Sequence, residues 1–159
     1  MIYDECQTII GHLRFALKEN GTLTRVFLTN YHWLLFVENN TVKKSSELGE
    51  PIRQQFQEYL SGERKDFTLP FELEGTSFQK QVWDALQTIP YGETRSYFEI
   101  ACSIGRPQAI RAIGHANSRN PLPIIFPCHR VIGKNQRLTG YAGGIGMKKQ
   151  LLHIEGVMV

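Results

Sequence analysis

Residues 120–133 read Asn-Pro-Leu-Pro-Ile-Ile-Phe-Pro-Cys-His-Arg-Val-Ile-Gly, and this stretch is the most informative part of the chain. An apolar run at residues 124–126 leads through a proline into a thiol, an imidazole and a guanidinium, and then the chain turns apolar again. Proline fixes φ and biases the preceding residue toward extended backbone, so three prolines within seven positions predict a stiff lead-in that orients Cys128. The pattern indicates a reactive group set in a hydrophobic wall.

Cys128 has two interpretations. Free cysteine often packs as a small hydrophobic residue, so a buried structural thiol is the simpler one. His129 and Arg130 favour a functional thiol, because both would stabilise a thiolate. Neighbouring side chains in an extended segment point to opposite faces, so Cys128 and His129 could meet only through a turn or an intervening water.

The composition describes an ordinary globular protein. A chain of 159 residues with 42% hydrophobic content can form one domain or two small ones with a real core. It has neither a run of about eighteen apolar residues nor an N-terminal signal segment. We therefore expect a soluble protein without a membrane partner, located in the cytoplasm or, in a eukaryote, in the nucleus.

Three widely spaced cysteines, Cys6, Cys102 and Cys128, without a Cys-x-x-Cys pair argue against a disulfide framework and a cysteine-rich zinc site. Cys6 with His12 and His32 matches no zinc-ligand spacing. We expect no metal and no cofactor.

The net charge of +3 conceals an asymmetry. Residues 1–74 hold 8 Lys and Arg against 11 Asp and Glu, a balance of −3, whereas residues 75–159 hold 10 against 4, a balance of +6. A local basic excess indicates a polyanionic partner, with nucleic acid the first candidate and a merely solvated basic face the alternative.

Residues 1–74 are typical of a small mixed α/β domain. Residues 13–17 and 23–37 predict strands of a meander, with a tight turn at residues 29–31, and residues 47–60 predict a helix. None of these segments contains a catalytic constellation, so we interpret this domain as a scaffold.

The second half begins with two capping-box patterns, at Thr76 and at Ser96. The first predicts a helix over residues 78–89, which Pro90 would end, and the second predicts a short helix over residues 97–103.

Pro107 then suits the first position of a helix over residues 107–118. Two helices joined by a short glycine-containing turn form a helix-turn-helix signature. Its apolar side would pack through Ala109, Ile110 and Ile113. The opposite side carries Gln108, Arg111, Ala112, Gly114 and His115. Small residues permit close approach to a duplex, and a projecting arginine suits a groove or an opened base stack.

Near the C-terminus, a loop has four glycines at residues 140–146, and residues 147–155 predict a closing helix. Glu155 would lie in its last turn, where the helix dipole disfavours a carboxylate. Glu155 is therefore either exposed to solvent or held by a cation.

The chain resembles the O6-alkylguanine-DNA alkyltransferases, the methylated-DNA–protein-cysteine methyltransferases. The resemblance is dense from residue 75 to residue 156 and weak before it. In chain order it rests on residues 75–79 with 82–83, 89–93 with 96–97, 111–114, 120–121, 127–131, 141–144, 151–152 and 155–156. Pro-Cys-His-Arg-Val at residues 127–131, flanked by these pieces, is a highly specific pattern.

The resemblance implies the fold class, mixed α/β (α+β). Residues 1–74 would form a small antiparallel-sheet domain like part of ribonuclease H. Residues 75–159 would form a winged helix-turn-helix domain that binds DNA and carries alkyl transfer. The implied partner is double-stranded DNA containing O6-alkylguanine; the recognition helix would enter its minor groove, and the damaged nucleotide would be flipped out. We expect a monomer, because no spare amphipathic element remains.

The resemblance also implies residue roles. Cys128 resembles the alkyl acceptor, and His129 with Glu155 its activating relay through a water. Tyr97 resembles the hydroxyl donor to the guanine ring, and Arg111 the finger that fills the gap in the base stack.

Further implied roles concern the walls of the site. Asn120 resembles the residue that bridges the helix-turn-helix and the active-site segment. The carbonyls of Cys128 and Val131, the N–H of Ala142 and the neighbouring Tyr141 resemble the base-binding groups. Some family members carry Ser where this chain has Ala142, but the implied contact uses the backbone.

The chemistry agrees with these roles. A free thiol is only a few per cent ionised at neutral pH, so a base is required. A hydrogen-bond donor such as Tyr97 would help guanine to leave. The thioether product has no easy hydrolytic exit, which predicts one turnover per molecule.

Two other functions compete with this one. A non-catalytic helix-turn-helix module that binds alkylated DNA and recruits partners would leave His129, Glu155 and Tyr97 unexplained. A Cys-His hydrolase usually draws its Cys and His from distant parts of the sequence, whereas here the histidine near the thiol is its neighbour.

Overall fold

The polypeptide forms two units, Met1–Leu73 and Glu74–Val159, in the computed structural model, which describes all 159 residues. The division falls next to the boundary expected after residue 74. No helix combines the length and the apolar composition that crossing a membrane requires.

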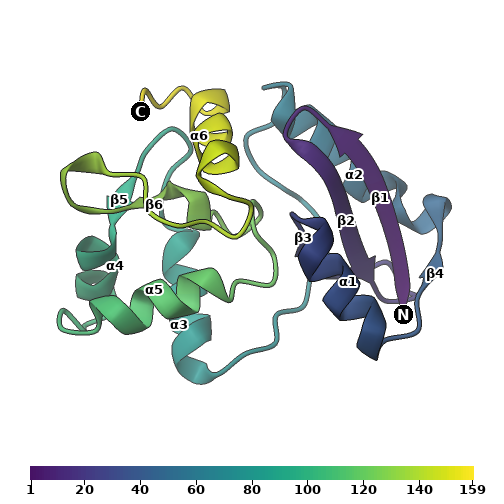
Figure 1. Cartoon of the computed structure of the whole chain (residues 1–159), viewed down its shortest axis with the longest axis horizontal. Coiled ribbons are helices and arrows are strands. Elements are labelled where there is room, and N and C mark those ends of the chain that lie inside the picture. The colour runs from purple at the N-terminus through teal and green to yellow at the C-terminus, as the bar shows by residue number, and fades with distance from the viewer. The chain divides into compact units, whose positions relative to one another are not determined.

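A four-stranded sheet organises the first unit (Figure 1). Its strands are β1 (Ile2–Thr8), β2 (Gly11–Leu17), β3 (Leu23–Phe27) and β4 (Lys43–Lys44), in the order β3-β2-β1-β4. β1, β2 and β3 pair antiparallel, whereas the short β4 runs parallel to β1. β1 lies in residues for which the sequence had predicted no element.

Two helices cover opposite faces of this sheet, α1 (Asn30–Asn39) and α2 (Ser46–Leu60). Successive side chains of a strand point to opposite faces, and β2 shows this directly. Phe15 stacks on Phe56 of α2, whereas Ala16 packs in a cluster with Trp33 of α1. The sheet is therefore buried on both sides.

Of the strands predicted over residues 23–37, the one before the expected turn at residues 29–31 is present as β3, whereas the one after it is wrong, because α1 occupies those residues. Thr29 does not make a tight turn between strands; its side chain accepts a hydrogen bond from the N–H of His32 and caps α1. Trp33 and Phe36, at helical spacing, then contact Phe27 of β3. A Thr N-cap and a turn look alike in sequence, and the packing of these rings decides for the helix.

The second unit is built from helices and a small parallel ribbon. Its elements are α3 (Ser77–Leu86), β5 (Arg95–Ser96), α4 (Tyr97–Ser103), α5 (Ile110–Ser118), the 3-10 turn η1 (Cys128–Arg130), β6 (Val131–Ile132), the 3-10 turn η2 (Lys134–Gln136) and α6 (Ile145–Ile154). Both predicted capping boxes are present in full, at the heads of α3 and α4. The mixed α/β fold class is confirmed.

Packing of α3, α4 and α5 fixes the helix-turn-helix. The indole Nε1 of Trp83 donates to the carbonyl of Ala116 across the buried interface (2.9 Å), and Ile113 of α5 is fully buried. β5 pairs in parallel with β6, which continues directly from η1. The helix-turn-helix and the Cys128 stretch therefore belong to one core.

Three of the predicted helices need corrected boundaries. α5 begins at Ile110 and not at Pro107, because residues 106–109 form a turn closed by the Ala109 N–H to Arg106 carbonyl bond (2.9 Å). Ile110, expected to pack, is consequently 40% exposed. α3 ends at Leu86, three residues before the predicted end, and α6 occupies Ile145–Ile154 where residues 147–155 were expected.

Candidate active site

The turn η1 places Cys128 at the wall of a cavity. Pro127 precedes it, and the N–H of Arg130 donates back to the Pro127 carbonyl (3.0 Å), so the backbone turns between the thiol and the imidazole. The Cys128 side chain is 4% exposed. The segment is therefore a turn, and not the extended backbone in which neighbouring side chains point to opposite faces.

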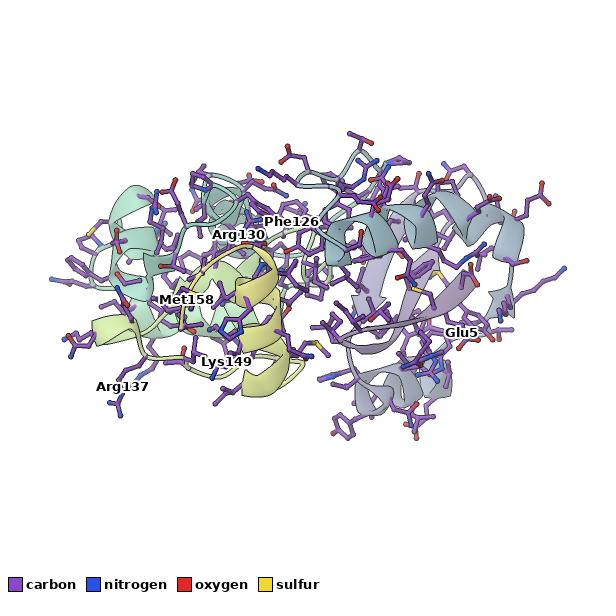
Figure 2. The ribbon with its side chains drawn as sticks, turned by 90° about the horizontal axis from the view of Figure 1, so that it is seen from above. Glu5, Phe126, Arg130, Arg137, Lys149 and Met158 are labelled. Atoms are coloured by element: carbon purple, nitrogen blue, oxygen red, sulfur yellow. The ribbon has the colours of Figure 1, made fainter.

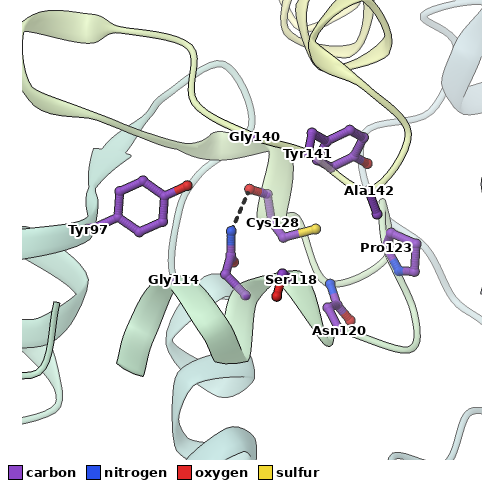
Figure 3. Close-up of a pocket in the computed structure, with 10 residues that line it drawn as sticks. Tyr97, Gly114, Ser118, Asn120, Pro123, Cys128, Gly140, Tyr141 and Ala142 are labelled. Atoms are coloured by element: carbon purple, nitrogen blue, oxygen red, sulfur yellow. Dashed lines mark hydrogen bonds between the residues drawn. The ribbon is translucent and has the colours of Figure 1, made fainter. Parts of the chain in front are cut away.

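The cavity has a volume of about 370 Å³. Its lining comes from α4, α5, the Cys128 stretch and the glycine-rich loop: Tyr97, Gly114, Asn117, Ser118, Asn120, Pro123, Cys128, Gly140, Tyr141 and Ala142. Figure 3 shows the sulfur of Cys128 pointing to the side where Asn120, Pro123 and Ala142 lie, with Tyr97 on the other side. The thiol thus lies in a cavity that the Tyr97 phenol bounds on one side and the backbone of the glycine-rich loop bounds on the other.

Asn120 braces the approach to Cys128. Its Oδ1 accepts from the Leu122 N–H (2.9 Å) and its Nδ2 donates to the Phe126 carbonyl (2.7 Å), so one amide spans the whole apolar run. Within that run Ile124 has φ of +77°, a left-handed conformation that is strained for a β-branched residue. The lead-in to Cys128 is thus a turn braced by the Asn120 amide, and its stiffness stays a prediction.

A buried charge cluster lies behind Cys128. Glu155, the C-cap of α6, accepts from His129 Nε2 through Oε2 (2.8 Å) and from Arg130 Nε through Oε1 (2.8 Å), and Arg130 Nη2 adds a third bond to Oε2 (2.9 Å). Arg130 also donates to the Ile89 carbonyl (2.8 Å), and its guanidinium lies over the Tyr91 ring. Of the two alternatives for Glu155, the structure selects the carboxylate held by cations.

This cluster defines the tautomer of His129. A carboxylate can only accept, so Nε2 carries the hydrogen and Nδ1 is the basic nitrogen of the neutral ring. Burial lowers the pKa of His129 below its usual 6.5, although Glu155 opposes the shift. The imidazole is therefore neutral near pH 7 and able to accept a proton.

The thiol itself is also held neutral. Burial raises the pKa of Cys128 to about 11, while a hydrogen bond with Asn120 and the positive charge of Lys148 act in the opposite direction. Lys148 is a fully buried side chain of α6 whose Nζ donates to the Val131 carbonyl (2.6 Å), and burial lowers its pKa to about 8. Cys128 therefore needs a base to react at neutral pH.

The residues expected to touch DNA lie on another face. Gln108, Arg111, Ala112 and His115 are exposed and border a second hollow, of about 660 Å³, between α5 and the head of α3. Gly114 belongs instead to the Cys128 cavity. Arg137, on the loop after β6, extends outward, whereas Arg130 lies beside α6 (Figure 2). The expected residues thus form two groups, one around the thiol and one along α5.

Several side chains of this site were missed or only half recognised in the sequence. Asn117 donates to the Cys128 carbonyl (3.4 Å, the dashed line in Figure 3), and its Oδ1 has no partner. Thr139 contacts Tyr97, and Arg130 completes the Glu155 cluster. Of the residues missed outright, Asn117, Thr139 and Lys148, only Lys148 carried a usable signal, since it lies one turn before the buried Leu151 and Leu152 on the same side of α6.

No group of three or more His, Cys, Asp or Glu side chains is arranged to hold a metal ion.

Residues 77–157 match the family model described as "6-O-methylguanine DNA methyltransferase, DNA binding domain". Along nearly its whole length the chain is 50% identical to the constitutive methylated-DNA–protein-cysteine methyltransferase of Bacillus subtilis, covering 98% of this chain and 95% of that protein. The chain belongs to the methylated-DNA–protein-cysteine methyltransferase family.

Other members of this methyltransferase family extend the likeness. The protein of that name from Methanosarcina acetivorans is 54% identical over 156 residues, which cover 98% of this chain and 99% of that one. The crystal structure of Mycobacterium tuberculosis OGT in complex with DNA has a TM-score of 0.85 at 42% identity, covering 98% of this chain and 92% of that chain. The resemblance inferred from the sequence is thereby confirmed, and it extends over the first 74 residues, where the sequence had shown it only weakly.

Proposed function

We propose that this protein repairs DNA by moving the alkyl group of O6-alkylguanine onto the Sγ of Cys128, once per molecule. The observation that carries the proposal is a buried, neutral thiol that faces a cavity and is backed by the His129–Glu155–Arg130 cluster. A structural cysteine would need neither the cavity nor the neighbouring neutral imidazole.

Activation begins with the proton of Cys128. The basic Nδ1 of His129 takes it through a bridging water, and Glu155, which already accepts from Nε2, stabilises the imidazolium that results. Arg130 holds the carboxylate in place and neutralises it while the imidazole is uncharged. Because Glu155 already accepts hydrogen bonds from both His129 and Arg130, it can stabilise the charged imidazole without moving.

Transfer follows as a displacement. The thiolate attacks the alkyl carbon, the S–C bond forms, the C–O6 bond breaks, and the electron pair passes to guanine. The proton first taken from the thiol replaces the alkyl group on the base, so the reaction balances. Tyr97 donates a hydrogen bond to the ring as negative charge develops there. The thioether that remains leaves the protein inactive.

Base contacts would come from backbone. The carbonyls of Cys128 and Val131 already accept from Asn117 and Lys148, but a carbonyl oxygen has a second lone pair that can take a base amino hydrogen. The N–H of Ala142 supplies a donor, and Tyr141 lines the same wall. Asn120 keeps this wall in register with α5.

A duplex would bind along α5. Arg111 projects from the exposed face with Gln108, Ala112 and His115 around it, and the unit that contains them carries the basic excess of the chain. Extruding a base costs a few kcal/mol, which phosphate contacts and a wedge in the stack offset. In this proposal residues 75–159 bind DNA and transfer the alkyl group, residues 1–74 are a scaffold, and the protein acts inside the cell as a monomer.

The experiment uses a duplex with a radiolabelled methyl group on one O6-methylguanine. We expect label to pass to the protein and not to its C128S variant, while both bind the duplex with similar affinity. A protein that binds the lesion tightly but acquires no label would instead be the non-catalytic binding module.

A further inference from the structure

The hydroxyl of Tyr97 is engaged within the protein, and its partner has no assigned role. Tyr97 is the first residue of α4, where the Ser96 capping box fixes its backbone. Its Oη lies 2.7 Å from the Oγ1 of Thr139, a residue 42 positions further along the chain. The two hydroxyls thus form a short hydrogen bond at the edge of the Cys128 cavity.

Thr139 is itself fixed from two further directions. Its carbonyl accepts from Nζ of the buried Lys148 (3.4 Å), which ties the loop to α6. Its methyl group occupies the space that Gly133 leaves open, since a Cβ built on Gly133 would lie 2.8 Å from Cγ2 of Thr139. The hydroxyl, the carbonyl and the methyl group of Thr139 each contact a different part of the protein, and these contacts fix the position of the hydroxyl.

The direction of this bond decides what Tyr97 can do. Each hydroxyl has one hydrogen, so if Tyr97 donated to Thr139 it could only accept from a molecule in the cavity. If Thr139 donates to Tyr97, the phenolic hydrogen is available to that molecule. A hydrogen bond donated by Thr139 would also polarise the Tyr97 hydroxyl and strengthen the bond that Tyr97 donates to an acceptor gaining negative charge.

We propose that Thr139 is a positioning residue that orients and polarises the Tyr97 hydroxyl as the donor to the departing guanine. The inference rests on the proposed function, because it assigns Thr139 a part in the displacement at Cys128. Tyr97 donates a hydrogen bond and not a proton, so the balance of the reaction is unchanged. Thr139 acts when charge develops on the base and contributes little to binding the duplex.

The test compares T139V, which removes only the hydroxyl, with T139S, which keeps it. Rates of methyl transfer are measured in single turnover at saturating O6-methylguanine duplex, and affinity is measured separately on duplexes bound by C128S versions. We expect T139V to be roughly threefold to tenfold slower with unchanged affinity, the size of one neutral hydrogen bond, and T139S to retain the normal rate. T88V serves as the matched control, because the Thr88 hydroxyl donates to the Ala85 carbonyl, away from the cavity lining.

A double-variant cycle then separates positioning from general loosening of the loop. With Tyr97 replaced by Phe, the additional T139V change should have no effect, because no phenol remains to be oriented. Equal slowing by T139V in both backgrounds, or a T139V rate equal to that of the unaltered protein, would overturn the inference and leave the proposed function intact. Failure of the unaltered protein to transfer methyl would overturn both.

Discussion

At the scale of single residues, the reactivity of this protein depends on where the proton of Cys128 resides. With a pKa of about 11, roughly one thiol in ten thousand is ionised at neutral pH. His129 is likewise neutral, because burial lowers its pKa. Both groups are thus stored in their uncharged forms, and charge separates only when the proton moves from sulfur to imidazole beside Glu155 and Arg130.

The pH dependence of methyl transfer follows from these directions. Because the pKa of His129 lies below 6.5, the ring is the neutral base at pH 7 and becomes protonated only on acidification. We expect the single-turnover rate to stay level between about pH 7 and pH 8 and to fall as the pH drops through the His129 pKa. Rapid-quench assays on the same duplex at constant ionic strength measure this profile. A rate that increases on acidification would rule out His129 as the proton acceptor.

At the scale of elements, Glu155 joins the end of α6 to η1. It does so through three hydrogen bonds to His129 and Arg130, all of them buried. A buried charge cluster of this kind contributes little net stability compared with an apolar replacement, but losing one partner leaves the others uncompensated.

Replacement of Glu155 by Gln should therefore destabilise the protein by about 3–5 kcal/mol, because the Arg130 charge remains buried without its counterion. Denaturant unfolding followed by circular dichroism measures the change. The control is E93Q, since Glu93 is half-exposed and pairs with Arg95 at the surface, where such a loss costs about 0–1 kcal/mol. Equal stabilities of E155Q and E93Q would show that the buried cluster is not held as described.

The exposed side of α5 carries the second element-scale prediction. Replacing Arg111 by Ala should slow transfer from a duplex at least tenfold, because no side chain then fills the gap left by the extruded base. Transfer from free O6-methylguanine base should be unchanged. R119A is the matched control, an exposed arginine at the end of the same helix but outside the second hollow. If R111A and R119A reduce the duplex reaction equally, Arg111 acts only as one more positive charge.

Local patterns in the sequence predicted local structure well. Thr76 with Gln79 and Ser96 with Glu99 formed the expected capping boxes, because every bond of such a box lies within four residues. Thr29 misled, since the same residue type suits a turn and an N-cap, and the packing of the Trp33 ring against Phe27 distinguishes them.

The residues that complete the site could not be predicted for a related reason. The sequence allowed a cation beside Glu155, but Arg130 lies 25 positions away, and Thr139 lies 42 positions from Tyr97. Such pairs depend on how β6, α6 and the glycine-rich loop come together, which no periodicity encodes. The resemblance to the alkyltransferases supplied Tyr97 and the pair of His129 with Glu155, but neither Thr139 as the partner of Tyr97 nor Arg130 as the second partner of Glu155.

At the scale of the whole molecule, charge and chemistry lie in the same half of the chain. The unit that holds Cys128 and α5 carries the basic excess, whereas the first 74 residues have a balance of −3 and contribute no lining residue to the Cys128 cavity. The first unit has its own aromatic core, in which Phe56 and Tyr59 pack against Phe67. A division between a scaffold and a reactive unit accounts for this distribution.

The central claim is that each molecule transfers one alkyl group to one atom and then stops. The measurement that tests it most directly is the intact mass of the protein after incubation with excess O6-methylguanine duplex, followed by peptide mapping. We predict a gain of one methyl group, confined to the peptide that contains Cys128 and ending at one equivalent. An unchanged mass despite tight binding, or a methyl group on Cys6 or Cys102, would contradict it.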